Sequence, residues 1–182
     1  MSLIILAPIA AVVALAFAGY LAYTVTRESE GTEKMATIAA AIRKGANAYF
    51  KRQYKGVAVF FAVMFVILII MALVGYIDIF VPVAFVSGGF FSALSGFFGM
   101  KIATSANART ANAASQSLNK GLRVSFSSGA VMGIVVVGLG LLHLSIWFFF
   151  LNWYYGTFQA LPVNQAIQRL SSALLMSGMG AS

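Results

Sequence analysis

The side chains that most often carry out chemistry in proteins are scarce in this chain and widely spaced. Its 182 residues contain four acids (Glu28, Glu30, Glu33 and Asp78), one histidine (His143) and no cysteine. Without cysteine the chain has no disulfide, no thiol nucleophile and no thiolate metal site. It also contains no paired carboxylates, no H-E-x-x-H metal motif, no phosphate-binding glycine loop and no dinucleotide fingerprint. We therefore predict no catalytic, cofactor-binding or metal-binding residue within it.

Ionisable side chains are equally rare where a membrane pathway for ions would need them. Proton relays and cation sites in membranes are usually built on buried carboxylates, yet none of the four acids falls inside a long apolar run. His143 does lie well inside such a run. A lone histidine there is more often a hydrogen-bonded packing residue than a proton carrier, so we predict packing. Arg169 is predicted to lie near a membrane edge or to face a cavity.

The basic residues follow the pattern of a membrane protein. The chain has twelve Lys and Arg and a net charge of +8, and all of them except Arg169 lie in segments 27–55 and 101–123. They stand beside apolar runs, where such residues set topology, and are not interleaved with aromatic residues on a polar surface. A nucleic-acid partner is therefore excluded. Lys120–Arg123, at a predicted helix start, has the charge to meet an anion, but topology explains it more simply.

Composition places these residues on membrane helices. The chain is 61% hydrophobic and 9% charged, whereas soluble domains carry about 25% charged residues. A soluble fold of this size cannot bury so much apolar surface, so we predict an all-α integral membrane protein. The first apolar run is longer than a signal-peptide core and is interpreted as a retained span. Four transmembrane helices are predicted at about 3–25, 56–77, 80–100 and 126–150, followed by a truncated fifth from about 164.

The segments between these spans carry the charge. Segment 26–55 has apolar residues at three- and four-residue steps, which predicts an amphipathic helix, capped at Thr32, that covers the bundle; a lipid-specific or calmodulin-like site is the alternative. Segment 101–125 belongs to the longest polar interruption, Gly99–Gly133, and its Ala, Ser and Asn residues favour a third helix that continues beyond the membrane. The positive-inside rule places both segments in the cytoplasm, with the N-terminus and the Asp78 turn outside.

Small residues recur at four-residue spacing in two of the spans. This spacing lets helix backbones approach closely in lipid, so we predict tight helix packing; a pore lined by serine hydroxyls is the alternative. The rows are Gly88, Ser92 and Gly96; Ser95 and Gly99; and Ser125, Gly129 and Gly133.

Three strings of the sequence are typical of one family. They are EGTEKMATIAAAIRKGANAYFKRQYK (Glu30–Lys55), GMKIATSANARTANAA (Gly99–Ala114) and SGAVMG (Ser128–Gly133). In this order and with these separations, they closely resemble the membrane-bound, ion-translocating inorganic pyrophosphatases.

The resemblance implies a much longer protein, with many more helices, that works as a homodimer in a bacterial cell membrane. Members of this family hydrolyse pyrophosphate with Mg²⁺ on the cytoplasmic side and couple hydrolysis to outward pumping of Na⁺ or protons; some depend on K⁺. Their substrate motifs and gate acids lie on later helices and do not occur here, so no site residue is carried over. We expect these helices to be an inactive scaffold on their own, and we favour sodium as the transported ion.

A different class of protein fits part of the same pattern. A small, self-contained transporter or membrane scaffold would also have four helices. However, a small multidrug-type transporter would be expected to carry an acid embedded in the membrane, and this chain has none there. The last apolar stretch also reaches Ser182 without a polar anchor, from which we expect a fragment of a longer protein.

Overall fold

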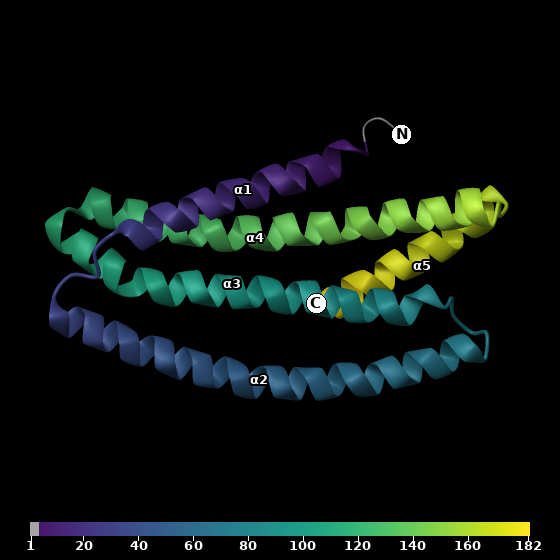
Figure 1. The fold of residues 1–182 in the computed structure, drawn as a ribbon, viewed down its shortest axis with the longest axis horizontal. Helices are drawn as coiled ribbons and strands as arrows, with labels where there is room; N and C mark the ends of the chain where they lie inside the picture. Colours follow the sequence, from purple (N-terminus) through teal and green to yellow (C-terminus); the bar gives the residue numbers. More distant parts are fainter. Residues whose placement is uncertain (1–3) are drawn as a thin grey trace. The chain divides into compact units, whose positions relative to one another are not determined.

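The computed structural model describes residues 4–182, which form α-helices joined by short connections (Figure 1). Within these residues, four helical segments are long and apolar enough to cross a membrane: Leu6–Arg27, Glu33–Leu73, Phe80–Gln116 and Leu118–Phe158. The predicted all-α membrane fold with four spanning helices is therefore confirmed. In order, the elements are α1 (Leu6–Arg27), α2 (Glu33–Leu73), α3 (Phe80–Gln116), α4 (Leu118–Trp153), the π-helical turn η1 (Tyr154–Phe158) and α5 (Val163–Ala181).

Three of the helices are longer than a bilayer core. α2, α3 and α4 have 41, 37 and 36 residues, which at about 1.5 Å per residue exceeds a hydrocarbon core of about 30 Å. The predicted extension of the third helix is thus confirmed. The amphipathic helix predicted in segment 26–55 is not separate from the second span, because α2 contains both. Its sequence has no proline, and its Gly45 and Gly56 are tolerated in the helix interior.

The polar stretch Gly99–Gly133 is almost entirely helical. α3 ends at Gln116 and α4 begins at Leu118, so Ser117 alone separates them. The Gly121 amide donates to the Ser117 carbonyl at 3.0 Å. A Cβ atom at Gly121 would lie 2.7 Å from the Ala114 Cβ, so only glycine allows the two helix ends to approach this closely.

The connection from α1 to α2 is set by two residues. Gly31 has a φ of +88°, a conformation that favours glycine. Thr32 then caps α2, because its hydroxyl accepts a hydrogen bond from the Met35 amide at 3.4 Å, as predicted.

The chain divides into two compact units, which we describe separately. The basic unit contains residues 10–54 and 94–138, and with them every Lys and Arg except Lys55 and Arg169. The aromatic unit contains residues 4–9, 55–93 and 139–182. Many hydrophobic side chains on both units are exposed, as expected of helices that face lipid.

Helix α5 packs closely against α3 in the aromatic unit (Figure 1). A Cβ at Gly88 would overlap the Ser177 carbonyl oxygen, and a Cβ at Gly180 would overlap the Phe85 carbonyl oxygen. The small-residue prediction is therefore confirmed at Gly88, although the partner is the fifth helix. Farther toward the N-terminus of α5, its Ala173 belongs to a core of five buried residues: Ala84, Trp147, Leu151, Tyr155 and Ala173.

The small-residue prediction is only partly confirmed in the basic unit. A Cβ at Gly99 would lie 3.0 Å from the Met132 side chain, so α3 and α4 are close there. Gly129 and Gly133, in contrast, have open space where a Cβ would stand. Among the described residues no side chain or backbone packs on these two glycines, so tight packing of that row stays a prediction.

Candidate functional site

The Asp78 cluster, formed by Asp78, Tyr155 and Arg169, joins three elements of the aromatic unit. The Asp78 side chain is 9% exposed and lies in the turn between α2 and α3. Its Oδ1 accepts hydrogen bonds from the Tyr155 hydroxyl at 2.5 Å and from the Phe80 amide at 3.0 Å. Its Oδ2 lies 3.4 Å from the Arg169 Nη1. The cluster therefore ties the turn to η1 and α5.

Local structure explains why an acid suits this turn. Phe80 is the first residue of α3, so its amide has no partner within the helix. The Asp78 carboxylate satisfies that amide and lies at the positive end of the helix dipole. Tyr155, which donates to the same carboxylate, belongs to η1 and is 1% exposed. π-Helical turns are frequent at functional sites.

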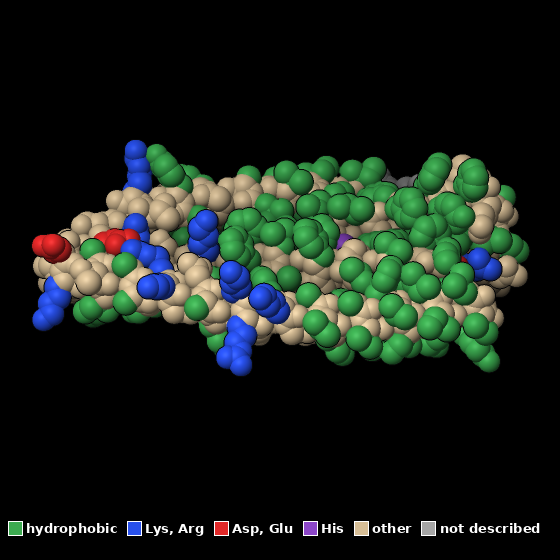
Figure 2. All heavy atoms as spheres, turned by 60° about the horizontal axis from the view of Figure 1, so that its bottom comes forward, with side chains coloured by type: hydrophobic (Ala, Val, Ile, Leu, Met, Phe, Trp, Pro, Cys, Tyr) green, Lys and Arg blue, Asp and Glu red, His purple; other side chains and the backbone are tan. Residues whose placement is uncertain are grey.

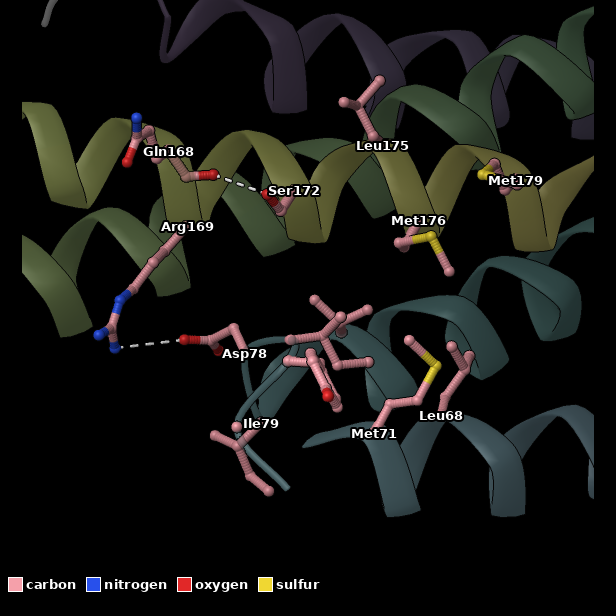
Figure 3. Close-up of a pocket in the computed structure, with 14 residues that line it drawn as sticks. Leu68, Met71, Asp78, Ile79, Gln168, Arg169, Ser172, Leu175, Met176 and Met179 are labelled. Carbon is pink, nitrogen blue, oxygen red and sulfur yellow. Dashed lines mark hydrogen bonds and ion pairs between the residues drawn. The ribbon is translucent and has the colours of Figure 1, made fainter. Parts of the chain in front are cut away.

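A cavity of about 830 Å³ opens beside the Asp78 cluster (Figure 3). Arg169 points toward Asp78 at one end of the view, and Met176 and Met179 line the space farther along α5. Of the two alternatives predicted for Arg169, a membrane edge or a cavity, the structure shows the side chain lining a cavity. The α2 side contributes Leu68 and Met71. The cavity has apolar walls and one polar, charge-paired mouth.

The His143 cluster is a second polar group, buried among apolar helices. His143 is 4% exposed, its Nε2 is 2.9 Å from the Ser87 hydroxyl and its Nδ1 is 3.3 Å from the Ser177 hydroxyl. The Trp147 Nε1 donates to Ser87 at 2.8 Å, and Phe91 stacks on the imidazole ring. Both ring nitrogens are occupied by neutral hydroxyls. The prediction of a hydrogen-bonded packing histidine is confirmed.

The Glu30 cluster, formed by Glu30, Arg43 and Arg109, lies in the basic unit. The Glu30 Oε1 is 2.8 Å from the Arg43 Nη1 and 2.9 Å from the Arg109 Nη1. The Arg109 Nε also donates to the Glu28 carbonyl at 3.0 Å. Arg109 thus holds the α1–α2 connection against α3. Nearby, Lys120 pairs with the Glu28 carboxylate at 3.5 Å.

These pairs set the charge state of Glu30. The hydrogen bond from Arg43 is the main cause that holds the pKa of Glu30 below its ordinary value, and Arg109 adds to it; partial burial opposes both. A lowered carboxyl pKa stabilises the fold fully above the ordinary pKa of about 4.5. That contribution is lost as pH falls through the lowered value.

We therefore expect Glu30→Gln to destabilise the protein at pH 7 by about 1 kcal/mol, since one charge-assisted, partly exposed cluster is lost. The difference from the wild type should shrink as pH falls below about 4.5. Thermal unfolding of the detergent-solubilised full-length protein between pH 7 and pH 3 measures this. Glu33→Gln is the matched control, because Glu33 has no ion-pair partner among the described residues. If Glu30→Gln lowers the free energy of unfolding by the same amount at every pH, the charge of Glu30 does not stabilise the fold through these ion pairs.

The carboxylates of the described residues do not form a metal centre. Within residues 4–182, no group of three or more His, Asp or Glu side chains lies close enough to hold a metal ion. Glu28, Glu30 and Asp78 each face a cation instead. These acids are therefore used as ion-pair partners between segments, and this geometry does not fit Mg²⁺.

Sequence reasoning placed several of these residues singly but missed their clusters. From the sequence we expect Asp78 in a turn and Arg169 near a membrane edge or facing a cavity, but not that these two side chains meet each other and Tyr155. Arg169 and Asp78 are 91 residues apart, and no local pattern links them. One signal was available, because Asp78 is the only acid outside segment 28–33 and Arg169 is the only cation outside the two basic segments.

Comparison with known proteins identifies the family. The family described as Inorganic H+ pyrophosphatase matches residues 12–182. A Bacteroides thetaiotaomicron protein inferred to be a K(+)-stimulated pyrophosphate-energized sodium pump is 52% identical over 97% of this chain. A K(+)-insensitive pyrophosphate-energized proton pump of Methanosarcina mazei is 38% identical over 79% of it. Proton pump 2 of Moorella thermoacetica, also named K(+)-insensitive and pyrophosphate-energized, is 41% identical over 82%.

These relatives are much longer than the chain. The chain spans 24% of the length of the Bacteroides protein and 21% of each of the other two. The family match nevertheless includes most of α1 and all of α2, α3, α4 and α5. On this match and these identities, the chain belongs to the family of inorganic H+ pyrophosphatases.

Proposed function

We propose that this chain supplies N-terminal scaffold helices of a pyrophosphate-energised ion pump, which hydrolyses pyrophosphate and moves Na⁺ or protons outward. The observation that carries the proposal is the 52% identity over 97% of the chain with a relative named for this activity. The structure supports a scaffold role, because three of its four acids, Glu28, Glu30 and Asp78, hold segments together in ion pairs. The catalytic residues then lie in parts of the protein outside this chain.

Mg²⁺ belongs to the same proposal. In the full-length pump it would bind outside these helices, since Glu28, Glu30 and Asp78 are all committed to Lys or Arg partners. Within this chain, Arg43 and Arg109 hold Glu30 in place. Their part in the function is to keep the polar ends of α2 and α3 in position beside the catalytic segments.

The transported ion and the assembly extend the proposal. We favour Na⁺, because the Bacteroides relative, which is 52% identical, is inferred to be a sodium pump that K⁺ stimulates. We also propose a homodimer in the cell membrane, with the basic unit on the cytoplasmic side. The Lys and Arg of segments 27–55 and 101–123 support this orientation through the positive-inside rule.

Hydrolysis is the direct test. Membranes that carry the full-length protein should release phosphate from pyrophosphate when Mg²⁺ is present, and Na⁺ should stimulate the release. Membranes that carry residues 1–182 alone should release none, because no described group of acids suits the reaction. Phosphate release is measured against membranes without the protein. If the full-length protein releases no more phosphate than this control, the proposal of pyrophosphate hydrolysis is wrong. If residues 1–182 alone hydrolyse pyrophosphate, the active site lies within this chain and not outside it.

A further inference from the structure

A row of basic side chains on α2 is not used by any of the clusters above. Lys44, Lys51 and Arg52 are exposed, and seven or eight residues along an α-helix bring side chains back to nearly the same face. All three belong to the basic unit and to one helix, so their spacing follows from the helix itself. Figure 2 shows several Lys and Arg side chains gathered on the face that it draws.

These cations lack acidic partners within the described chain. The ion pairs of residues 4–182 join Glu28, Glu30 and Asp78 to four other basic residues: Arg43, Arg109, Lys120 and Arg169. Within residues 4–182, the positive charge of the row is therefore not compensated by an ion pair. Arg43, next to Lys44 on the same helix, does not belong to the row because its guanidinium pairs with Glu30.

The height of Lys51 and Arg52 along α2 matches a lipid headgroup layer. The apolar span of α2 begins at residue 56 in the sequence-based prediction, so Lys51 and Arg52 lie about 6–8 Å from it along the helix axis. The headgroup region on each side of a bilayer core is about 5–8 Å thick. Lys44 lies about 18 Å from the span, which is about one Debye length beyond the headgroups.

We propose that Lys51 and Arg52 form a binding surface for the headgroups of anionic phospholipids, to which Lys44 adds a weaker, longer-range attraction. Charge complementarity supports this occupant, because phosphate oxygens accept hydrogen bonds from Lys and Arg, and an anionic leaflet concentrates such groups at this height. The surface fixes the depth of α2 in the bilayer. This inference does not depend on pyrophosphate hydrolysis.

The test measures lipid binding to the full-length protein. Native mass spectrometry with added phosphatidylglycerol gives an apparent Kd at low salt, and phosphatidylcholine is the neutral reference. The double variant Lys51→Gln/Arg52→Gln should bind phosphatidylglycerol about thirtyfold more weakly. Lys51→Arg/Arg52→Lys should bind as the wild type does, which separates loss of charge from loss of fold. Raising the salt should weaken wild-type binding.

Lys34→Gln is the matched control for position. Lys34 is also exposed and on α2, without an acidic partner among the described residues, but it lies about 33 Å from the span. Its substitution should change the Kd less than twofold, and Lys44→Gln should fall between the two. A Lys34→Gln effect as large as that of the single variant Lys51→Gln, which should weaken binding about fivefold, would overturn the proposal in favour of net charge alone. Equal binding of phosphatidylcholine, or an unchanged Kd in the double variant, would also overturn it.

Discussion

Gly88→Ala is expected to destabilise the protein by about 1–3 kcal/mol or more, whereas the same change at Gly140 should stabilise it slightly. At Gly88 the new Cβ meets the Ser177 carbonyl oxygen, which belongs to the α5 backbone and cannot move without shifting the helix. At Gly140 the Cβ enters open space. There, only the higher helix propensity of alanine remains, worth about 0.5–1 kcal/mol.

The opposite signs of these two changes make the test sharp. Thermal unfolding of the full-length protein in one detergent is the measurement, and it compares two glycines that both lie within the aromatic unit. Gly180→Ala should behave like Gly88→Ala, because its Cβ would overlap the Phe85 carbonyl oxygen. If Gly88→Ala unfolds at or above the wild-type temperature, the close contact between α3 and α5 is not present in the protein.

Asp78→Ala is expected to cost about 2–4 kcal/mol, more than the loss of either of its side-chain partners. The substitution leaves the buried Tyr155 hydroxyl and the Phe80 amide without their acceptor, and a buried unsatisfied polar group costs about 1–3 kcal/mol. Arg169→Ala should cost about 1 kcal/mol or less, because its side chain is 47% exposed and its pairing is screened by water. Tyr155→Phe should fall between the two.

A double-mutant cycle separates the contributions to this cluster. Asp78→Ala with Tyr155→Phe should show a coupling energy of at least about 1 kcal/mol, since the two side chains share one hydrogen bond. Asp78→Ala with Arg169→Ala should show a smaller one. Unfolding free energies of the full-length protein provide both values. If Arg169→Ala proves as costly as Asp78→Ala, the ion pair holds the turn, and the hydrogen bonds to Tyr155 and Phe80 do not.

The extents of the helices show which features a local pattern predicts well. The four spans follow from hydropathy, because burial in lipid requires a continuous apolar run with its backbone satisfied internally. The boundary between the amphipathic segment and the second span was not predictable in the same way. Both periodicities are helical, so nothing in residues 34–55 ends the helix before the span begins.

The sequence by itself determined the membrane class, the four spans, the position of the charges and the family. Each of these depends on composition or on residues that are close together in the chain. The tertiary structure alone decided that Asp78 meets Tyr155 and Arg169, that Glu30 holds Arg109, and that Gly88 packs while Gly129 meets no neighbour among the described residues. These contacts join residues far apart in the chain, so only the packing of the helices determines which side chains, and which glycine faces, come together.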